Sequence, residues 1–123
     1  MSRLSMSRIA ASLAFVLVAS AALAHAQLQK AIPAVGGTVT ASPKEIRLKF
    51  SEGVEPRFSG IALATEAGAT EPIGKPGVDP ADNSVLIAIV SEALKPGTYT
   101  VTWHAVSVDT HKTQGSFNFT VAP

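Results

Sequence analysis

Apolar and polar residues alternate with a period of two along most of the chain after residue 26, a pattern typical of β-strands with one buried face. Ile46, Leu48 and Phe50, for example, alternate with charged residues. The run from Val85 to Val90 is apolar on both faces and predicts a central strand. The predicted strands are residues 37–41, 44–50, 60–64, 85–90, 98–105 and 116–121.

Proline and glycine separate these strands, as expected for the turns of an all-β sandwich. The glycine- and proline-rich stretch from Glu66 to Asp82 predicts a long irregular loop, and no helix is predicted after residue 24. About seven strands in one domain of about 99 residues indicate a β-sandwich of immunoglobulin-like size. We expect the Tyr99 hydroxyl to tie a corner of this sandwich. The aromatic residues expected in the core are Phe50, Phe58, Tyr99, Trp103, Phe117 and Phe119.

The first 24 residues follow a different pattern. Arg3 and Arg8 supply a positive start, the stretch from Ile9 to Ala22 is almost wholly apolar, and small residues follow. This is the composition of a secretory signal peptide. The apolar stretch is short for a membrane span, which needs about 20 apolar residues, and no later segment approaches that length. We expect residues 1–24 to be removed and residues 25–123 to form a domain that is not inserted in a membrane.

Two positions satisfy the small-x-small rule for signal-peptide cleavage. Cleavage after Ala24 makes His25 the first residue of the mature chain, whereas cleavage after Ala26 removes this histidine. The first position is favoured, because a bulky imidazole is less typical beside the scissile bond. The choice matters for function, since a histidine with a free amine is a metal chelator.

Charge and sulfur content exclude several classes of function. Arg3 and Arg8 are two of ten basic residues, so residues 25–123 carry eight basic against nine acidic residues, a net charge of −1. Without a basic run, nucleic acids and anionic membranes are poor partners. Cysteine is absent, which excludes disulfides, thiolate metal sites and catalytic thiols. Both methionines, Met1 and Met6, precede residue 25, so the exported domain is expected to have no sulfur ligand.

Asp109 and His111 are the residues with candidate chemistry near the C-terminus. If this segment is extended, both side chains point the same way and offer an oxygen and a nitrogen to Cu(II), Ni(II) or Zn(II). The pair is a weak signal alone, because an aspartate capping a turn beside a surface histidine is ordinary. A terminal His25 strengthens it: its amine and Nδ1 would complete an N3O ligand set, which favours Cu(II). Cu(I) is disfavoured, because it prefers sulfur ligands.

Four motifs occur together in a specific order. They are His25-Ala-Gln-Leu-Gln-Lys followed by Pro33, the strand Ile46-Arg-Leu-Lys-Phe-Ser-Glu52, the segment Pro96-Gly-Thr-Tyr-Thr-Val-Thr-Trp103, and Val106-Ser-Val-Asp-Thr-His111 ending in Gly115-Ser-Phe-Asn-Phe119. In this combination the chain resembles the CopC family of periplasmic copper-resistance proteins. The resemblance covers the whole chain after residue 24.

The resemblance implies a Greek-key β-sandwich, a periplasmic location, and one Cu(II) per chain held by His25, Asp109 and His111. It also implies a role for Glu52 in or beside the copper ligands, although the sequence itself shows only a carboxylate at a strand end. The implied partners are an inner-membrane copper transporter or another periplasmic copper protein. Some family members carry a methionine-rich Cu(I) loop at the other end of the sandwich. The corresponding stretch here, Ala64 to Asp79, has no methionine and no histidine, so the resemblance is to the Cu(II)-only members.

Several alternatives remain open at this point. His104, on the outward face of its strand, is a candidate ligand, a candidate donor that orients Asp109, or a surface imidazole. A small copper oxidase or monooxygenase is disfavoured, because Asp109 would fill a position that oxygen needs and no nucleophile set or pair of acid and base carboxylates is present. We therefore expect the protein not to be an enzyme. An immunoglobulin-like interaction module without a functional metal site would follow if cleavage after Ala26 removed His25.

Overall fold

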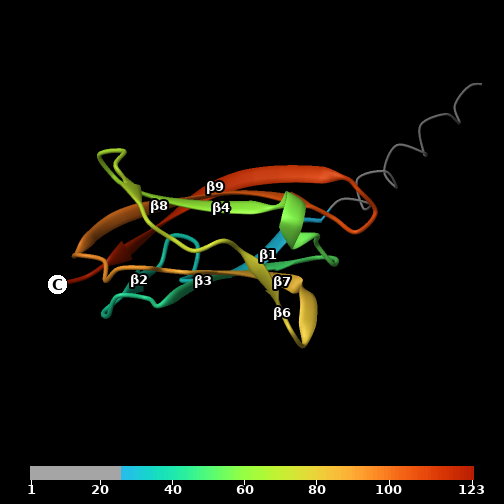
Figure 1. Ribbon diagram of the computed structural model, residues 1–123. Coiled ribbons are helices and arrows are strands. Elements are labelled where there is room, and N and C mark those ends of the chain that lie inside the picture. Colours follow the sequence, from blue (N-terminus) through green and yellow to red (C-terminus); the bar gives the residue numbers. More distant parts are fainter. Residues whose placement is uncertain (1–25) are drawn as a thin grey trace, which may run out of the picture.

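The chain forms two β-sheets that face each other, as seen in a computed structural model that describes residues 26–123 (Figure 1). The four-stranded sheet has the order β1-β3-β7-β6, and the five-stranded sheet has the order β2-β9-β8-β4-β5. The strands are β1 (Leu28–Ile32), β2 (Thr38–Val39), β3 (Glu45–Phe50), β4 (Gly60–Thr65), β5 (Thr70–Glu71), β6 (Gly77–Asp79), β7 (Asp82–Ile89), β8 (Gly97–Val106) and β9 (Lys112–Val121). The predicted all-β sandwich is confirmed.

The longest strands form where the alternation in the sequence is cleanest. In β3 the residues Ile46, Leu48 and Phe50 are fully buried, and the charged residues between them face outward. β3 pairs with β7 and β4 pairs with β8, so strands far apart in the sequence become neighbours, as in Greek-key connections. The predicted central strand is correct, because β7 lies between β3 and β6.

The core lies between the two sheets and holds most of the expected aromatic residues. Phe50 packs edge-to-face against Trp103 with ring centroids 5.1 Å apart, and Tyr99 stacks on Phe119 at 5.7 Å. Such ring pairs add about 0.5–1.5 kcal/mol each to the free energy of burial. The Phe50–Trp103 pair joins the two sheets, whereas Tyr99 and Phe119 are neighbours on β8 and β9 of the five-stranded sheet.

Phe58 is the exception, and its expected place in the core is wrong: its side chain is 59% exposed. Phe58 ends the short 3-10 helix η3 (Pro56–Phe58) between β3 and β4, so it does not follow the inward alternation of a strand. The Arg57 guanidinium lies over its ring, 5.6 Å from the centroid. Within residues 26–123, no helix is long and apolar enough to cross a membrane.

The stretch from Glu66 to Asp82, expected to be irregular, contains the short strands β5 and β6. β5 extends the five-stranded sheet at β4, and β6 extends the four-stranded sheet at β7. Each has only two or three residues, too few to show a period in the sequence. Each forms one edge of its sheet, and together with β1, which was not predicted either, they raise the number of strands among residues 26–123 to nine.

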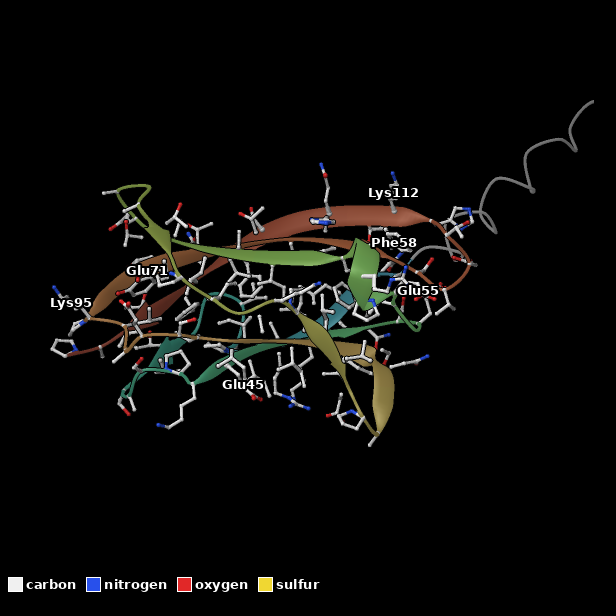
Figure 2. The ribbon with its side chains drawn as sticks, viewed as in Figure 1. Glu45, Glu55, Phe58, Glu71, Lys95 and Lys112 are labelled. Atoms are coloured by element: carbon white, nitrogen blue, oxygen red, sulfur yellow. The ribbon has the colours of Figure 1, made fainter. Side chains whose placement is uncertain are left out.

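The sandwich has two distinct ends. Figure 2 shows Phe58 and Lys112 near one end and Glu71 and Lys95 near the other. β8 runs between them, and its ten residues correspond to roughly 30 Å at about 3.3 Å per residue. The turn between β8 and β9, which holds Asp109 and His111, lies at the first end.

Candidate metal centre

Asp109 and His111 lie together in the turn between β8 and β9. The two strands are paired as far as Val106 and Lys112, and the five residues between these two form the turn. Oδ1 of Asp109 and Nδ1 of His111 are 3.2 Å apart. The sequence therefore predicted a pair of neighbouring side chains correctly.

The expected reason for this proximity was an extended backbone, and that expectation is wrong. Thr110, between the two residues, has a φ of 72°, in the left-handed region. The Thr110 amide donates to the Ser107 carbonyl at 2.8 Å, which closes the turn. His111 is thus returned toward Asp109 by a chain reversal and not by the two-residue period of a strand.

Ser107 connects the two ends of this turn. Its amide donates to the His111 carbonyl at 2.9 Å, and the His111 amide donates to the Ser107 hydroxyl oxygen at 3.2 Å. The same hydroxyl donates to Oδ1 of Asp109. Ser107 is fully buried, so these bonds are shielded from water.

The surroundings of Asp109 favour its ionised form. The Ser107 hydroxyl and then the His111 side chain donate hydrogen bonds to the carboxylate, and both hold the pKa of Asp109 below its ordinary value. Both side chains are partly exposed, at 43% for Asp109 and 48% for His111, so an ion has access to them.

The spacing of the two donor atoms suits a single metal ion. Two donors that each lie about 2.0 Å from one ion, at right angles, are roughly 2.8 Å apart. The 3.2 Å between Oδ1 and Nδ1 is close to this value, so a small adjustment would bring both onto one ion. An ionised carboxylate and an imidazole suit Cu(II), Ni(II) and Zn(II).

Glu52 belongs to the segment that packs directly beside this turn. The Val108 amide donates to the Gly53 carbonyl at 3.0 Å, and Val54 forms a β-bridge with Ser107. Glu52 directly precedes Gly53 and is half-buried. In the described part of the chain, however, no three His, Cys, Asp or Glu side chains come together, so Glu52 does not close a cluster with Asp109 and His111.

His25 lies outside the described residues, but the residues that follow it are held beside the same turn. Ala26 is fully buried, and the Thr113 hydroxyl donates to its carbonyl at 2.9 Å. The Gln27 amide donates to the Ser51 hydroxyl at 2.8 Å, and the Ser51 amide donates to the Gln27 carbonyl at 2.8 Å. The chain is thereby fixed from Ala26 onward. Its contact on β9 is Thr113, which follows His111 by two residues.

His104 does not join the pair. It lies on the outer face of β8, opposite Gln114 of β9 and Gly60 of β4. Its ring covers Gly60 so closely that a Cβ at that position would lie 2.3 Å from the His104 Cε1. His104 is outside any three-residue metal cluster among residues 26–123.

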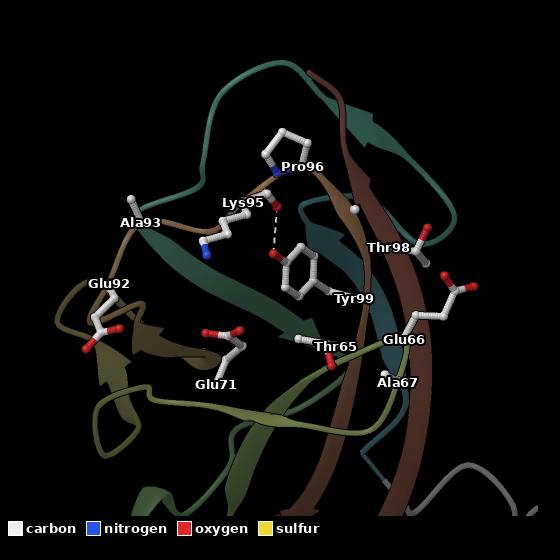
Figure 3. Close-up of a pocket in the computed structure, with 11 residues that line it drawn as sticks. Thr65, Glu66, Ala67, Glu71, Glu92, Ala93, Lys95, Pro96, Thr98 and Tyr99 are labelled. Atoms are coloured by element: carbon white, nitrogen blue, oxygen red, sulfur yellow. Dashed lines mark hydrogen bonds between the residues drawn. The ribbon is translucent and has the colours of Figure 1, made fainter.

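The far end of the sandwich holds a pocket of about 730 Å³ (Figure 3). Glu71, Glu92 and Lys95 surround Tyr99 there, and the Tyr99 hydroxyl donates to the Lys95 carbonyl at 2.6 Å, which confirms the expected corner. Burial, and then the charge of Glu71, raises the pKa of Tyr99. The residues lining this pocket include no histidine or methionine, so it lacks the ligands of a Cu(I) site.

Two residues that support this metal centre, Ser107 and Thr113, were not predicted from the sequence. Ser107 occupies the next inward position after Tyr99, Val101, Trp103 and Ala105, and a serine at a core position was the signal available. Thr113 gave no comparable signal, because threonine is common on strands and its partner is 87 residues away.

The fold and this centre define a class of protein: a small all-β sandwich with a carboxylate and an imidazole on the turn between its last two strands. Residues 28–122 match the CopC domain, and the chain belongs to the CopC family. Protein YobA of Escherichia coli strain K12 is 45% identical over a match of 108 residues that covers 85% of each chain.

Solved structures agree with this assignment. The crystal structure of CopC from Methylosinus trichosporium OB3b is 31% identical with a TM-score of 0.75, covering 80% of this chain and 95% of that one. The crystal structure of PcoC, a methionine-rich copper resistance protein from Escherichia coli, is 36% identical with a TM-score of 0.72, covering 80% and 99%.

Proposed function

We propose that the protein binds one Cu(II) ion per chain at the turn between β8 and β9, and sequesters or delivers this ion in the periplasm. The observation that carries the proposal is the 3.2 Å contact between the Asp109 and His111 donor atoms on an exposed turn. Two similar proteins, PcoC and the copper resistance protein C of Pseudomonas syringae pv. tomato, are named for copper resistance, which supports copper as the cargo.

The remaining ligands are proposed to come from the N-terminus. Cleavage after Ala24 would free the amine of His25, and the next residue, Ala26, is fixed beside Thr113, which follows His111 by two residues in the sequence. The amine and Nδ1 of His25, with Asp109 and His111, give an N3O set suited to Cu(II). Glu52, next to the turn, is the proposed additional ligand or hydrogen-bond partner.

The proposed role is transport or storage and not catalysis. Four donors around Cu(II) leave little room for oxygen to bind and react. The proposed recipient is an inner-membrane copper transporter or another periplasmic copper protein. A copper-loaded protein that consumed oxygen in the presence of a reductant would contradict the non-enzymatic role.

The test combines the mass of the exported protein with Cu(II) titrations. The mature chain should begin at His25, and His25→Ala or His111→Ala should weaken Cu(II) binding by a factor on the order of 100 or more with the fold intact. His104→Ala is the matched control, because it removes an imidazole outside the pair. A mature chain that begins at Gln27, or unchanged affinity in His111→Ala, would refute the proposal.

A further inference from the structure

Ser107 occupies a position where the fold calls for an apolar side chain. The inward residues of β8 are Tyr99, Val101, Trp103 and Ala105, all buried, and Ser107 continues the series with no exposed surface. A hydroxyl that is buried without a hydrogen-bond partner destabilises the folded protein. A serine is therefore favoured here only if its hydroxyl is fully used.

The hydroxyl is used by the two candidate ligands themselves. It donates to the Asp109 carboxylate and accepts a hydrogen bond from the His111 amide. Its oxygen is also 3.3 Å from the His111 carbonyl oxygen. One buried atom thus contacts both residues of the pair, and the β-bridge between Ser107 and Val54 fixes the Ser107 backbone to the neighbouring segment.

We propose that Ser107 is a positioning residue of the metal centre, whose hydroxyl holds the Asp109 carboxylate and the His111 backbone in place for Cu(II). This inference rests on the proposed function of the turn. Asp109 and His111 are partly exposed, so without this anchor the ion would have to order both side chains on binding. Groups that orient ligands in this way typically change metal affinity 10- to 100-fold.

The chain offers a matched control in Ser59. Ser59 is also buried, and its hydroxyl donates to the Glu55 carbonyl at 2.8 Å and accepts from the Val106 amide at 3.0 Å. It supports the same end of the sandwich but bonds only to backbone groups outside the pair. Ser59→Ala and Ser107→Ala therefore each remove one buried hydroxyl from the same region.

The experiment measures Cu(II) affinity and the Cu(II) electron paramagnetic resonance spectrum of the mature protein and its variants. Ser107→Ala should bind Cu(II) about 10- to 100-fold more weakly, with a spectrum shifted toward that of Asp109→Ala. Ser59→Ala should keep the wild-type affinity and spectrum. In the Asp109→Ala background, Ser107→Ala should cost much less affinity, because the group it positions is gone.

Three outcomes would overturn the inference. Equal losses of affinity in Ser107→Ala and Ser59→Ala would show a merely structural role. An undiminished effect of Ser107→Ala in the Asp109→Ala background would show that Ser107 does not act through the carboxylate. If Asp109→Ala and His111→Ala themselves bound Cu(II) like the wild type, the proposed site would fail, and with it the role of Ser107.

Discussion

Thr110 is the residue at which the turn of the metal centre is most strained. Its φ of 72° is rare for a β-branched residue and costs roughly 1–2 kcal/mol. Glycine adopts this conformation freely but loses about 0.5–1 kcal/mol through greater freedom in the unfolded chain. We expect Thr110→Gly to raise the free energy of unfolding by up to about 1 kcal/mol in urea unfolding of the metal-free protein. Thr110→Ala keeps the Cβ and should give no such gain; a gain in both variants would contradict the explanation.

Thr113 is the residue that ties the start of the described chain to β9. Thr113→Val keeps the shape of the side chain but removes the hydroxyl that donates to the Ala26 carbonyl. Ala26 and Gln27, which follow the proposed ligand His25, should then be held less firmly. Cu(II) affinity should therefore fall, roughly 10-fold, in a competition titration. Thr100→Val is the control, since its hydroxyl bonds to the exposed Asn118 side chain far from the turn. Equal affinities in the two variants would show that the tether does not contribute to binding.

At the scale of elements, β8 carries two consecutive ring side chains, Trp103 and His104, on opposite faces of its sheet. Each ring packs on a glycine of a neighbouring strand. Trp103 is buried over Gly115 of β9, where a Cβ would lie 2.8 Å from Cζ2 of the indole. His104 is exposed over Gly60 of β4, where a Cβ would lie 2.3 Å from Cε1 of the imidazole. The contact distance alone would make Gly60 more sensitive than Gly115 to replacement by alanine. The indole, however, is held in place by Phe50, whereas the imidazole borders solvent.

Alanine substitutions at these two glycines should therefore differ. Gly115→Ala should cost about 1–3 kcal/mol of stability, because the buried indole cannot move away without disturbing the core. Gly60→Ala should cost less than about 1 kcal/mol, because the His104 ring can rotate into solvent. Thermal or urea unfolding of the two variants measures the difference. A larger loss in Gly60→Ala would mean that the imidazole is held as firmly as the indole.

Strands could be predicted from the sequence wherever burial of one face makes apolar and polar residues alternate. β3 and β8 were predictable because one face of each is packed against the core. β5 and β6 were not, since two or three residues carry no period, and Phe58 was misplaced because hydrophobicity alone does not distinguish a strand from a 3-10 turn. Asp109 and His111 could be singled out by residue type, but the left-handed Thr110 that brings the two together could not, because the two-residue spacing was interpreted as an extended strand.

At the scale of the whole molecule, the outer face of the four-stranded sheet is covered by ion pairs between strands. Arg47 of β3 lies 2.6 Å from Asp79 of β6, and Lys49 of β3 lies 3.1 Å from Asp82 of β7. These pairs join three of the four strands on a face that also carries the exposed Ile89. They are partly exposed, so each contributes modestly to stability, but together they make that stability depend on pH.

Asp82 should dominate this pH dependence. Hydrogen bonds from the hydroxyl and amide of Ser84, and then from Lys49, lower the pKa of Asp82 from 3.8 to about 2. Above about pH 5 this carboxyl is ionised in the folded and unfolded chains alike, and its stabilising contribution is complete. As the pH falls toward 2, the unfolded chain takes up the proton first, so the contribution is lost. The pKa values of Asp79 and Asp109 are also lowered and act in the same direction.

We therefore expect the urea midpoint of the metal-free protein to fall between pH 5 and pH 2, and to fall less in Asp82→Asn than in the wild type. Ser84→Ala should be intermediate, because it removes the hydroxyl donor but keeps the amide and Lys49. Titration of the Asp82 carboxyl by nuclear magnetic resonance gives an independent reading of its pKa. An equal fall in Asp82→Asn and the wild type would mean that the acid sensitivity arises from other carboxylates, with Asp79 and Asp109 the next to replace.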